Sequence, residues 1–183
     1  SNSIGTFSGM ALIFGGIYLV IKKRISPSTP LSFFLSSIIL SFFVPEISKI
    51  PIGEILLVGI FMVADMPTTP VFLIGKIYFG MMLALVSSIL LSQKVQNEVL
   101  FYAIIILNSF TLLINKVLRP VTFGKNLEIE AIKQFLQLIV LTFLIVAATI
   151  ILINLYNFGL FKYLIYGYSI IMIITAFIFL KND

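Results

Sequence analysis

The sequence contains no cysteine, no histidine and no tryptophan, and only 10% of its 183 residues are charged. Without cysteine or histidine the chain forms no disulfide, no thiolate or imidazole metal site and no Ser-His-Asp triad of its own. It also has no glycine-rich phosphate-binding loop, and no nucleophile with a base close to it in sequence. We therefore expect neither a catalytic residue nor a metal site within this chain.

The residues that are present indicate a membrane protein. Hydrophobic residues make up 60% of the chain, and its mean hydropathy is +1.18. This composition predicts an all-α, polytopic helical membrane protein embedded in the lipid bilayer. The formal net charge is +5, but the basic residues fall between apolar segments, so we expect no nucleic-acid partner. The chain does not begin with Met, and we expect Ser1 to be an added residue or a position inside a longer protein.

Hydropathy divides the chain into seven apolar segments. They cover approximately residues 4–21, 30–44, 52–66, 77–92, 99–118, 134–156 and 163–180. A helix needs about 20 residues to cross the hydrocarbon core of a bilayer. The second and third segments are shorter, and Pro45 and Pro51 lie between them. This pattern predicts either a broken or re-entrant element within residues 30–66 or two short upright spans.

The distribution of lysine and arginine predicts the orientation in the cell (inner) membrane. If every segment crosses, one side carries Lys22, Lys23, Arg24, Lys76, Lys116, Arg119, Lys125, Lys133 and Lys181, and the other carries Lys49, Lys94 and Lys162. The basic excess marks the cytoplasmic side, which places the N-terminus outside and the C-terminus in the cytoplasm. The prediction holds if the second and third segments form one re-entrant hairpin, and fails if only one of them crosses.

Asp65 is the first candidate for a functional residue. It ends the apolar run that begins at Gly59, and the turn residues Pro67, Thr68 and Thr69 follow it. An ionised carboxylate costs several kcal/mol, roughly, at membrane depth, so one found there usually has a partner, a water-filled cavity or a function. The alternative interpretation is that Asp65 lies in the headgroup region and only ends the helix.

Asn108 and Asn115 lie seven residues apart, which places them two helical turns apart on one face of the fifth segment. A hydrogen bond between helices explains such a pair, and ligation of an ion is the alternative.

Several blocks resemble a known family. Leu12-Ile13-Phe14-Gly15-Gly16-Ile17-Tyr18-Leu19 looks like a first helix, and Gly75-Lys76 with Phe79-Gly80 match a later basic turn. Between them, Phe61-Met62-Val63-Ala64-Asp65 followed by Thr68-Thr69-Pro70 looks like the family's Phe-Met-Ala-Thr-Asp-Pro block. Residues 3–115 thus resemble the C-terminal half of RnfD, one of the membrane proteins of the Rnf electron-transport complex. They are equally similar to its homologue NqrB, which belongs to the sodium-translocating NADH:quinone reductase.

The chain also departs from that family. It has Ala64 where the family usually has Thr, Met66 where it has Pro, and Asn115 where it has Asp. The family attaches a flavin, FMN, through a phosphoester to a Thr in a Ser-Gly-Ala-Thr motif, and this chain has no such motif. The resemblance therefore implies FMN or another flavin in the family, without giving this chain an attachment residue.

The resemblance implies a fold and a function. Residues 1–119 would form a five-segment half of an inverted-repeat fold, followed by a charged linker at 120–130 and a two-helix membrane extension at 131–183. The expected function is a membrane subunit of an ion-translocating, flavin-dependent electron-transfer complex. Its partners would be other subunits of that complex or a missing N-terminal half. The resemblance implies that the ion or proton path is formed by Asp65, Thr68, Thr69, Glu98 and Asn108. The alternative is a small solute or ion channel or carrier without a redox cofactor.

Overall fold

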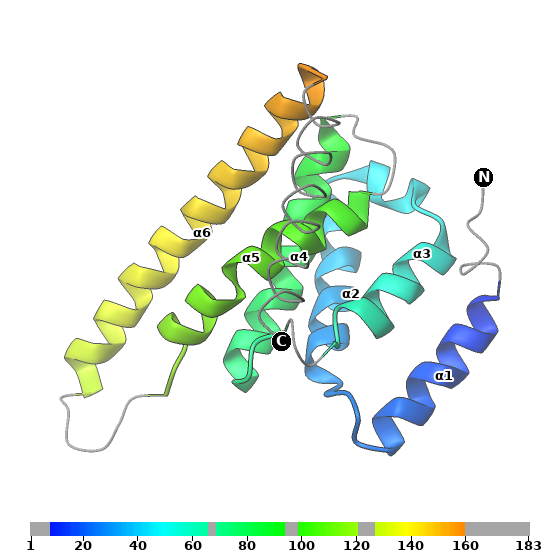
Figure 1. Ribbon diagram of the computed structural model, residues 1–183, viewed down its shortest axis with the longest axis horizontal. Helices are drawn as coiled ribbons and strands as arrows, with labels where there is room; N and C mark the ends of the chain where they lie inside the picture. The colour runs from blue at the N-terminus through cyan, green and yellow to red at the C-terminus, as the bar shows by residue number, and fades with distance from the viewer. Residues whose placement is uncertain (1–7, 66–68, 94–98, 121–126, 160–183) are drawn as a thin grey trace, which may run out of the picture. The chain divides into compact units, whose positions relative to one another are not determined.

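The computed structural model describes residues 8–65, 69–93, 99–120 and 127–159, and within them all regular secondary structure is helical. The elements are α1 (Gly9–Ile21), α2 (Ser28–Ser41), the 3₁₀ turn η2 (Pro45–Lys49), α3 (Ile52–Leu56), the π-helical turn η3 (Leu57–Met62), α4 (Leu73–Ser92), α5 (Val99–Val117) and α6 (Leu127–Asn157) (Figure 1). The predicted all-α class is confirmed.

The chain divides into two compact units, Ser1–Thr149 and Ile150–Asp183. The first unit contains α1 to α5 and the larger part of α6. Of the second unit, the structure describes the end of α6 together with Phe158 and Gly159. The predicted seventh apolar segment, 163–180, lies outside the described residues.

The helices fall into two length classes. Among the described residues, α4, α5 and the Ala131–Asn157 part of α6 are long and apolar enough to cross a membrane. The helix formed by α3 and η3 has 11 residues and α2 has 14, so they measure about 16 Å and about 21 Å against a hydrocarbon core of about 30 Å. The second and third segments are therefore short helices, as their apolar length indicates. That they are re-entrant stays a prediction.

Some helix starts lie outside the apolar segments. We expected apolar segments to begin at residues 77 and 134, whereas α4 begins at Leu73 and α6 at Leu127. The added first turns contain Lys76 in α4, and Glu128 and Glu130 in α6. Charged residues lower the hydropathy of a segment without preventing helix formation, so hydropathy marks the apolar portion rather than the ends of the helix.

Helix α4 is the centre of the first unit, with α2 on one side and α5 on the other (Figure 1). The two helices α2 and α4 approach closely at Gly80. A Cβ atom added there would lie 2.7 Å from the carbonyl oxygen of Thr29 and 2.9 Å from the nitrogen of Phe33. Because small residues let membrane helices approach closely, Gly80 allows the backbones of α2 and α4 to touch. The largest fully buried side chains of the described residues include Phe33 on α2, Phe79, Leu83 and Leu90 on α4, and Leu100 and Leu107 on α5.

Hydroxyl groups inside the helices bond to the helices themselves. Ser87 Oγ donates to the carbonyl oxygen of Leu83 at 2.7 Å, and Thr149 Oγ1 donates to that of Ile145 at 2.8 Å. Tyr78 Oη and Thr142 Oγ1 lie 3.1 Å apart and connect α4 to α6. Such bonds satisfy polar groups where no water is present, as a location in the hydrocarbon core requires.

Large apolar side chains cover the outside of the first unit. Exposed examples are Phe14 and Tyr18 on α1, Leu35 and Ile38 on α2, Ile105 and Leu112 on α5, and Phe135 and Phe143 on α6. Soluble monomers rarely expose contiguous apolar surface on this scale, whereas lipid favours it. The protein is located in a membrane.

Candidate functional site

Asp65 lies three residues after the end of the short helix formed by α3 and η3. In η3 the helix widens, because the nitrogen of Val63 donates to the carbonyl oxygen of Val58, five residues back, at 2.9 Å. Such π-helical turns are rare and frequently occur at functional sites. Val63 and Ala64 are buried, at 0% and 3% exposure, while Asp65, the next residue, is exposed. The wide turn therefore ends where the chain passes from the core to the surface.

The π turn lies against the aromatic side chains of α2. A Cβ atom added at Gly59 would be 2.8 Å from Phe34 Cζ and 2.9 Å from Phe33 Cδ1. The two rings themselves are 5.5 Å apart between centroids. A side chain at position 59 would force these rings to shift. Gly59 thus sets how closely the helix that precedes Asp65 approaches α2.

The loop after Asp65 is closed by Thr69. The main-chain oxygen of Asp65 accepts a hydrogen bond from Thr69 N at 3.1 Å and from Thr69 Oγ1 at 2.9 Å. Thr69 is buried at 7% exposure, and its hydroxyl proton is committed to this bond. Its oxygen still has lone pairs that can accept. Thr68 lies outside the described residues.

The same loop is attached to the end of α5. Asn115 Oδ1 accepts a hydrogen bond from Val71 N at 2.9 Å, across 44 positions of sequence. Gly75 lies against Pro70, since a Cβ atom added at Gly75 would be 2.9 Å from Pro70 Cβ. Sequence reasoning noted Asn115 but did not include it among the site residues. The signal was present, because Asn115 stands at the position where the resemblance places an Asp, which is also an acceptor.

Asn108 lies at the middle of α5. It is two turns before Asn115 on the same face, or about 10 Å along the helix axis. Its Oδ1 atom is buried and has no hydrogen-bond partner within the part of the chain that the structure describes. A buried acceptor without a donor costs about 1–3 kcal/mol, so this oxygen is a position where a proton donor or a cation would be stabilised. Glu98 lies outside the described residues.

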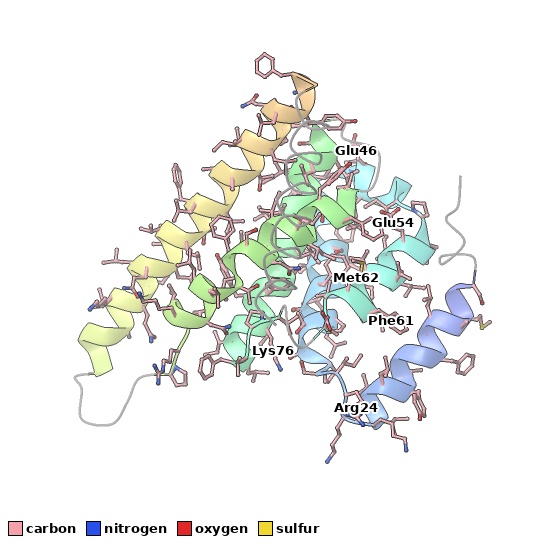
Figure 2. All side chains as sticks on the ribbon, in the orientation of Figure 1. Arg24, Glu46, Glu54, Phe61, Met62 and Lys76 are labelled. Atoms are coloured by element: carbon pink, nitrogen blue, oxygen red, sulfur yellow. The ribbon has the colours of Figure 1, made fainter. Side chains whose placement is uncertain are left out.

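Charge is distributed unevenly between the two ends of the first unit. Figure 2 shows Arg24 and Lys76 at the lower end of the view and Glu46 and Glu54 toward the upper end. Lys76 is in the first turn of α4, which follows the Asp65 loop directly. The Asp65 loop therefore belongs to the end of the unit that carries basic residues.

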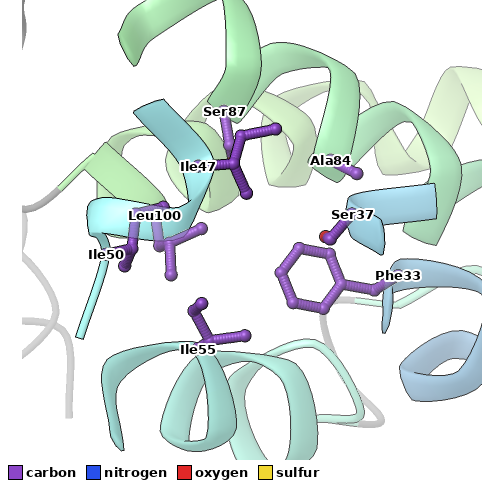
Figure 3. Close-up of a pocket in the computed structure, with 8 residues that line it drawn as sticks. All are labelled: Phe33, Ser37, Ile47, Ile50, Ile55, Ala84, Ser87 and Leu100. Atoms are coloured by element: carbon purple, nitrogen blue, oxygen red, sulfur yellow. The ribbon is translucent and has the colours of Figure 1, made fainter. Parts of the chain in front are cut away.

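A small cavity lies at the centre of the first unit. This cavity of about 10 Å³ lies between α2, η2, α3, α4 and α5, and Figure 3 shows the side chains that line it, from Phe33 and Ser37 to Ser87 and Leu100. A cavity needs about 10–15 Å³ to hold one water. This cavity can therefore hold at most a single water molecule.

The fold and the loop geometry define a polytopic helical membrane protein with a carboxylate at the end of a short helix that contains a π turn. Residues 1–124 match the NQR2, RnfD, RnfE family, and the chain belongs to this family. The match contains α1 to α5 and the Asp65 loop.

Two curated relatives are similar to this chain, and each is one subunit of a larger complex. The chain is 29% identical over 133 residues to a component of the proton-translocating ferredoxin:NAD(+) oxidoreductase complex of Clostridium ljungdahlii, an alignment that covers 68% of this chain and 40% of the relative. It is 29% identical over 123 residues to the corresponding component of the Na(+)-translocating ferredoxin:NAD(+) oxidoreductase complex of Acetobacterium woodii, covering 66% of this chain and 39% of the relative. The chain thus spans about two fifths of the length of the relatives it matches.

The family belongs to flavin-dependent complexes, which raises the question of whether the described threonines suit covalent flavin attachment. Thr29, Thr69, Thr111 and Thr149 are buried at 0–7% exposure. Thr142 is half-buried, and its hydroxyl donates to the carbonyl oxygen of Leu138 at 2.7 Å. A phosphoester needs a hydroxyl that the phosphate can reach, and none of these five offers one. The threonines that the structure describes do not fit this group.

Proposed function

We propose that this chain forms part of the membrane subunit of an ion-translocating, flavin-dependent electron-transfer complex of the Rnf/Nqr type. The observation that carries the proposal is the family match over residues 1–124, which contains five helices and the Asp65 loop. The two relatives are, by name, subunits of proton- and Na(+)-translocating ferredoxin:NAD(+) oxidoreductase complexes.

The part of this chain in such a complex is the ion or proton path. We assign the path to Asp65, Thr68, Thr69, Glu98 and Asn108. Three features of the described members support the assignment: Asp65 is an exposed carboxylate, Thr69 has a hydroxyl oxygen with acceptor capacity, and Asn108 has a buried, unpartnered amide oxygen. Protons and hard cations bind to oxygen atoms of these kinds. Asn115 would act as a positioning residue, because it attaches the loop after Asp65 to α5.

Redox chemistry in this proposal belongs to the flavin and to partner subunits. The described threonines offer no attachment residue, so the flavin would be held by residues outside the described ranges or by another subunit. The domain boundaries expected from the sequence are also proposed here: a membrane half at 1–119, a charged linker at 120–130 and a two-helix extension at 131–183. The N-terminus lies outside and the C-terminus in the cytoplasm.

A second candidate is a small solute or ion channel or carrier without a redox cofactor. The observation that favours it is the pair of short helices, α2 and α3 with η3, since transporters commonly place discontinuous helices around a site at the membrane midplane. The two candidates differ in what drives ion movement, because only the first couples it to electron transfer.

Sealed membrane vesicles that contain the complex test the proposal. We expect ion uptake to require both an electron donor and an acceptor, and to stop when the gene segment for this chain is deleted. The purified complex should show the visible absorbance of bound flavin. Ion uptake through this protein without electron transfer, in a complex that lacks flavin absorbance, would instead establish the carrier.

A further inference from the structure

A pocket of about 420 Å³ lies beside the Asp65 loop. It is formed by the end of α1, the turn into α2, the loop residues Ala64 and Thr69, and the first turn of α4. Its volume is within the range of sites for small organic molecules, which is about 300–1,000 Å³. It is also far larger than one water molecule, which occupies about 30 Å³.

The pocket combines apolar and cationic side chains. Val20 and Ile25 give it apolar walls, and Lys23 and Lys76 bring two ammonium groups from segments 53 positions apart in sequence (76 − 23). Neither lysine forms a salt bridge within the described ranges. The carboxylate closest in sequence, Asp65, is exposed and does not line the pocket. A space with two cations and no lining carboxylate favours an anion.

The backbone of Lys23 adopts an unfavourable, left-handed conformation. Its φ is +55°, and it is the left-handed residue that ends α1: Lys23 N donates to Val20 O at 2.9 Å, and Arg24 N donates to Leu19 O at 3.0 Å. Glycine is the usual residue at this position, because a Cβ atom is disfavoured there. A lysine here keeps the unfavourable backbone conformation that a glycine would avoid, and it places an ammonium group at the pocket.

Donor groups at the start of α2 add to the positive character of this region. This helix has 14 residues, and no side chain caps its first N–H groups. A helix N-terminus carries partial positive charge and readily binds phosphate. Pro27, which lines the pocket, directly precedes this helix.

We propose that this pocket binds the phosphate group of an organic phosphate ester, with an anionic phospholipid headgroup as the ligand that its walls fit best. Lys23 and Lys76 contact the phosphate, and Val20 with Ile25 contact the apolar part that follows. Basic pockets between membrane helices are a known setting for anionic headgroups. A phospholipid and a soluble phosphate ester both contain the phosphate, but only the phospholipid has acyl chains. An experiment can therefore distinguish these two ligands.

The test uses the full-length protein that contains this chain, purified in neutral detergent and freed of lipid. Phosphatidylglycerol, phosphatidylcholine or inorganic phosphate is titrated in, with the shift in Tm and the lipids retained in native mass spectrometry as readouts. We expect phosphatidylglycerol to bind more tightly than phosphatidylcholine. Lys23→Gly and Lys76→Gln should each weaken phosphatidylglycerol binding about 5-fold, and the double variant about 30-fold.

The variants separate binding from folding. Lys23→Gly relieves the left-handed backbone, so its Tm without phosphatidylglycerol should equal or exceed that of the wild type while binding is lost. Arg24→Gln is the matched control: Arg24 is the exposed neighbour of Lys23, does not line the pocket, and should keep binding.

Three results would overturn the proposal: equal affinity for the two lipids, unchanged binding of phosphatidylglycerol by the double variant, or an equal loss in Arg24→Gln. If inorganic phosphate displaces the lipid, and this displacement depends on Lys23 and Lys76, the phosphate site is supported and its ligand is a soluble phosphate ester.

Discussion

Asn108 and Asn115 provide a matched test of the site, because the same side chain stands twice on one face of α5 in different surroundings. Asn115 Oδ1 accepts a hydrogen bond from Val71 N at 2.9 Å, whereas Asn108 Oδ1 is buried without a partner in the described ranges. A satisfied hydrogen bond stabilises a protein by about 0.5–1.5 kcal/mol, while a buried acceptor without a donor costs about 1–3 kcal/mol. Leucine at the two positions should therefore change the free energy of unfolding in opposite directions.

The magnitudes follow from what each substitution removes. Asn108→Leu removes an unpaired buried oxygen and keeps a similar side-chain volume, so we expect a gain of about 1 kcal/mol. Asn115→Leu removes the bond to Val71, with a loss of about 1 kcal/mol, because the exposed Val71 can still find water for its N–H. The two variants should differ by about 2 kcal/mol in the free energy of unfolding.

The assay is chemical or thermal unfolding of both variants of the full-length protein in one detergent, followed by ion-coupled electron transfer in the intact complex. We expect Asn108→Leu to remain stable and to lose coupling, since it removes the oxygen that we assign to the ion path. If Asn108→Leu destabilises the protein as much as Asn115→Leu, its oxygen has a structural partner and the reasoning is refuted. Full coupling in a stable Asn108→Leu protein would remove this residue from the path.

Three further predictions concern charge, packing and orientation. The Asp65→Asn protein should assemble normally and lose most ion-coupled electron transfer, whereas the control Glu46→Gln should have little effect. Normal activity of Asp65→Asn would refute the role of Asp65 in the ion path. Loss of expression of Asp65→Asn would indicate that Asp65 only ends the helix. Gly80→Ala should lower the free energy of unfolding by about 1–3 kcal/mol, because the added methyl group would meet main-chain atoms of α2. The control Gly9→Ala should change the free energy of unfolding little, because a Cβ atom at position 9 has its nearest contact at 3.4 Å. A cysteine introduced at Lys181 should resist an impermeant thiol reagent added outside intact cells, and labelling there would reverse the orientation.

Much of the architecture could be predicted from the sequence, because hydropathy and length act locally. The apolar composition predicted the all-α class, and the short apolar runs on either side of Pro45 and Pro51 correspond to short helices. The helix starts were harder to predict. Lys76 and Glu128 lie in helical turns that an apolar segment leaves out.

The arrangement around Asp65 could not be predicted in the same way. The bond from Val71 to Asn115 joins residues 44 positions apart, and no local pattern identifies such a pair. Helical spacing alone does not show that Asn108 and Asn115 differ in their partners. Both features depend on how α5 packs beside the loop, which is a property of the tertiary structure.

The π turn directly precedes the point at which the chain passes from buried residues to the exposed Asp65, which lies three residues after the helix ends at Met62. One extra residue in a helical turn rotates every later side chain by about 100°, since an α-helix has 3.6 residues per turn. The bond from Val63 N to Val58 O introduces this rotation directly before Val63 and Ala64, which are buried, and Asp65, which is exposed. Gly59 lies inside the same turn and leaves room for the aromatic rings of α2. We infer that the packing of η3 against α2 fixes the position of the backbone from which the Asp65 loop departs.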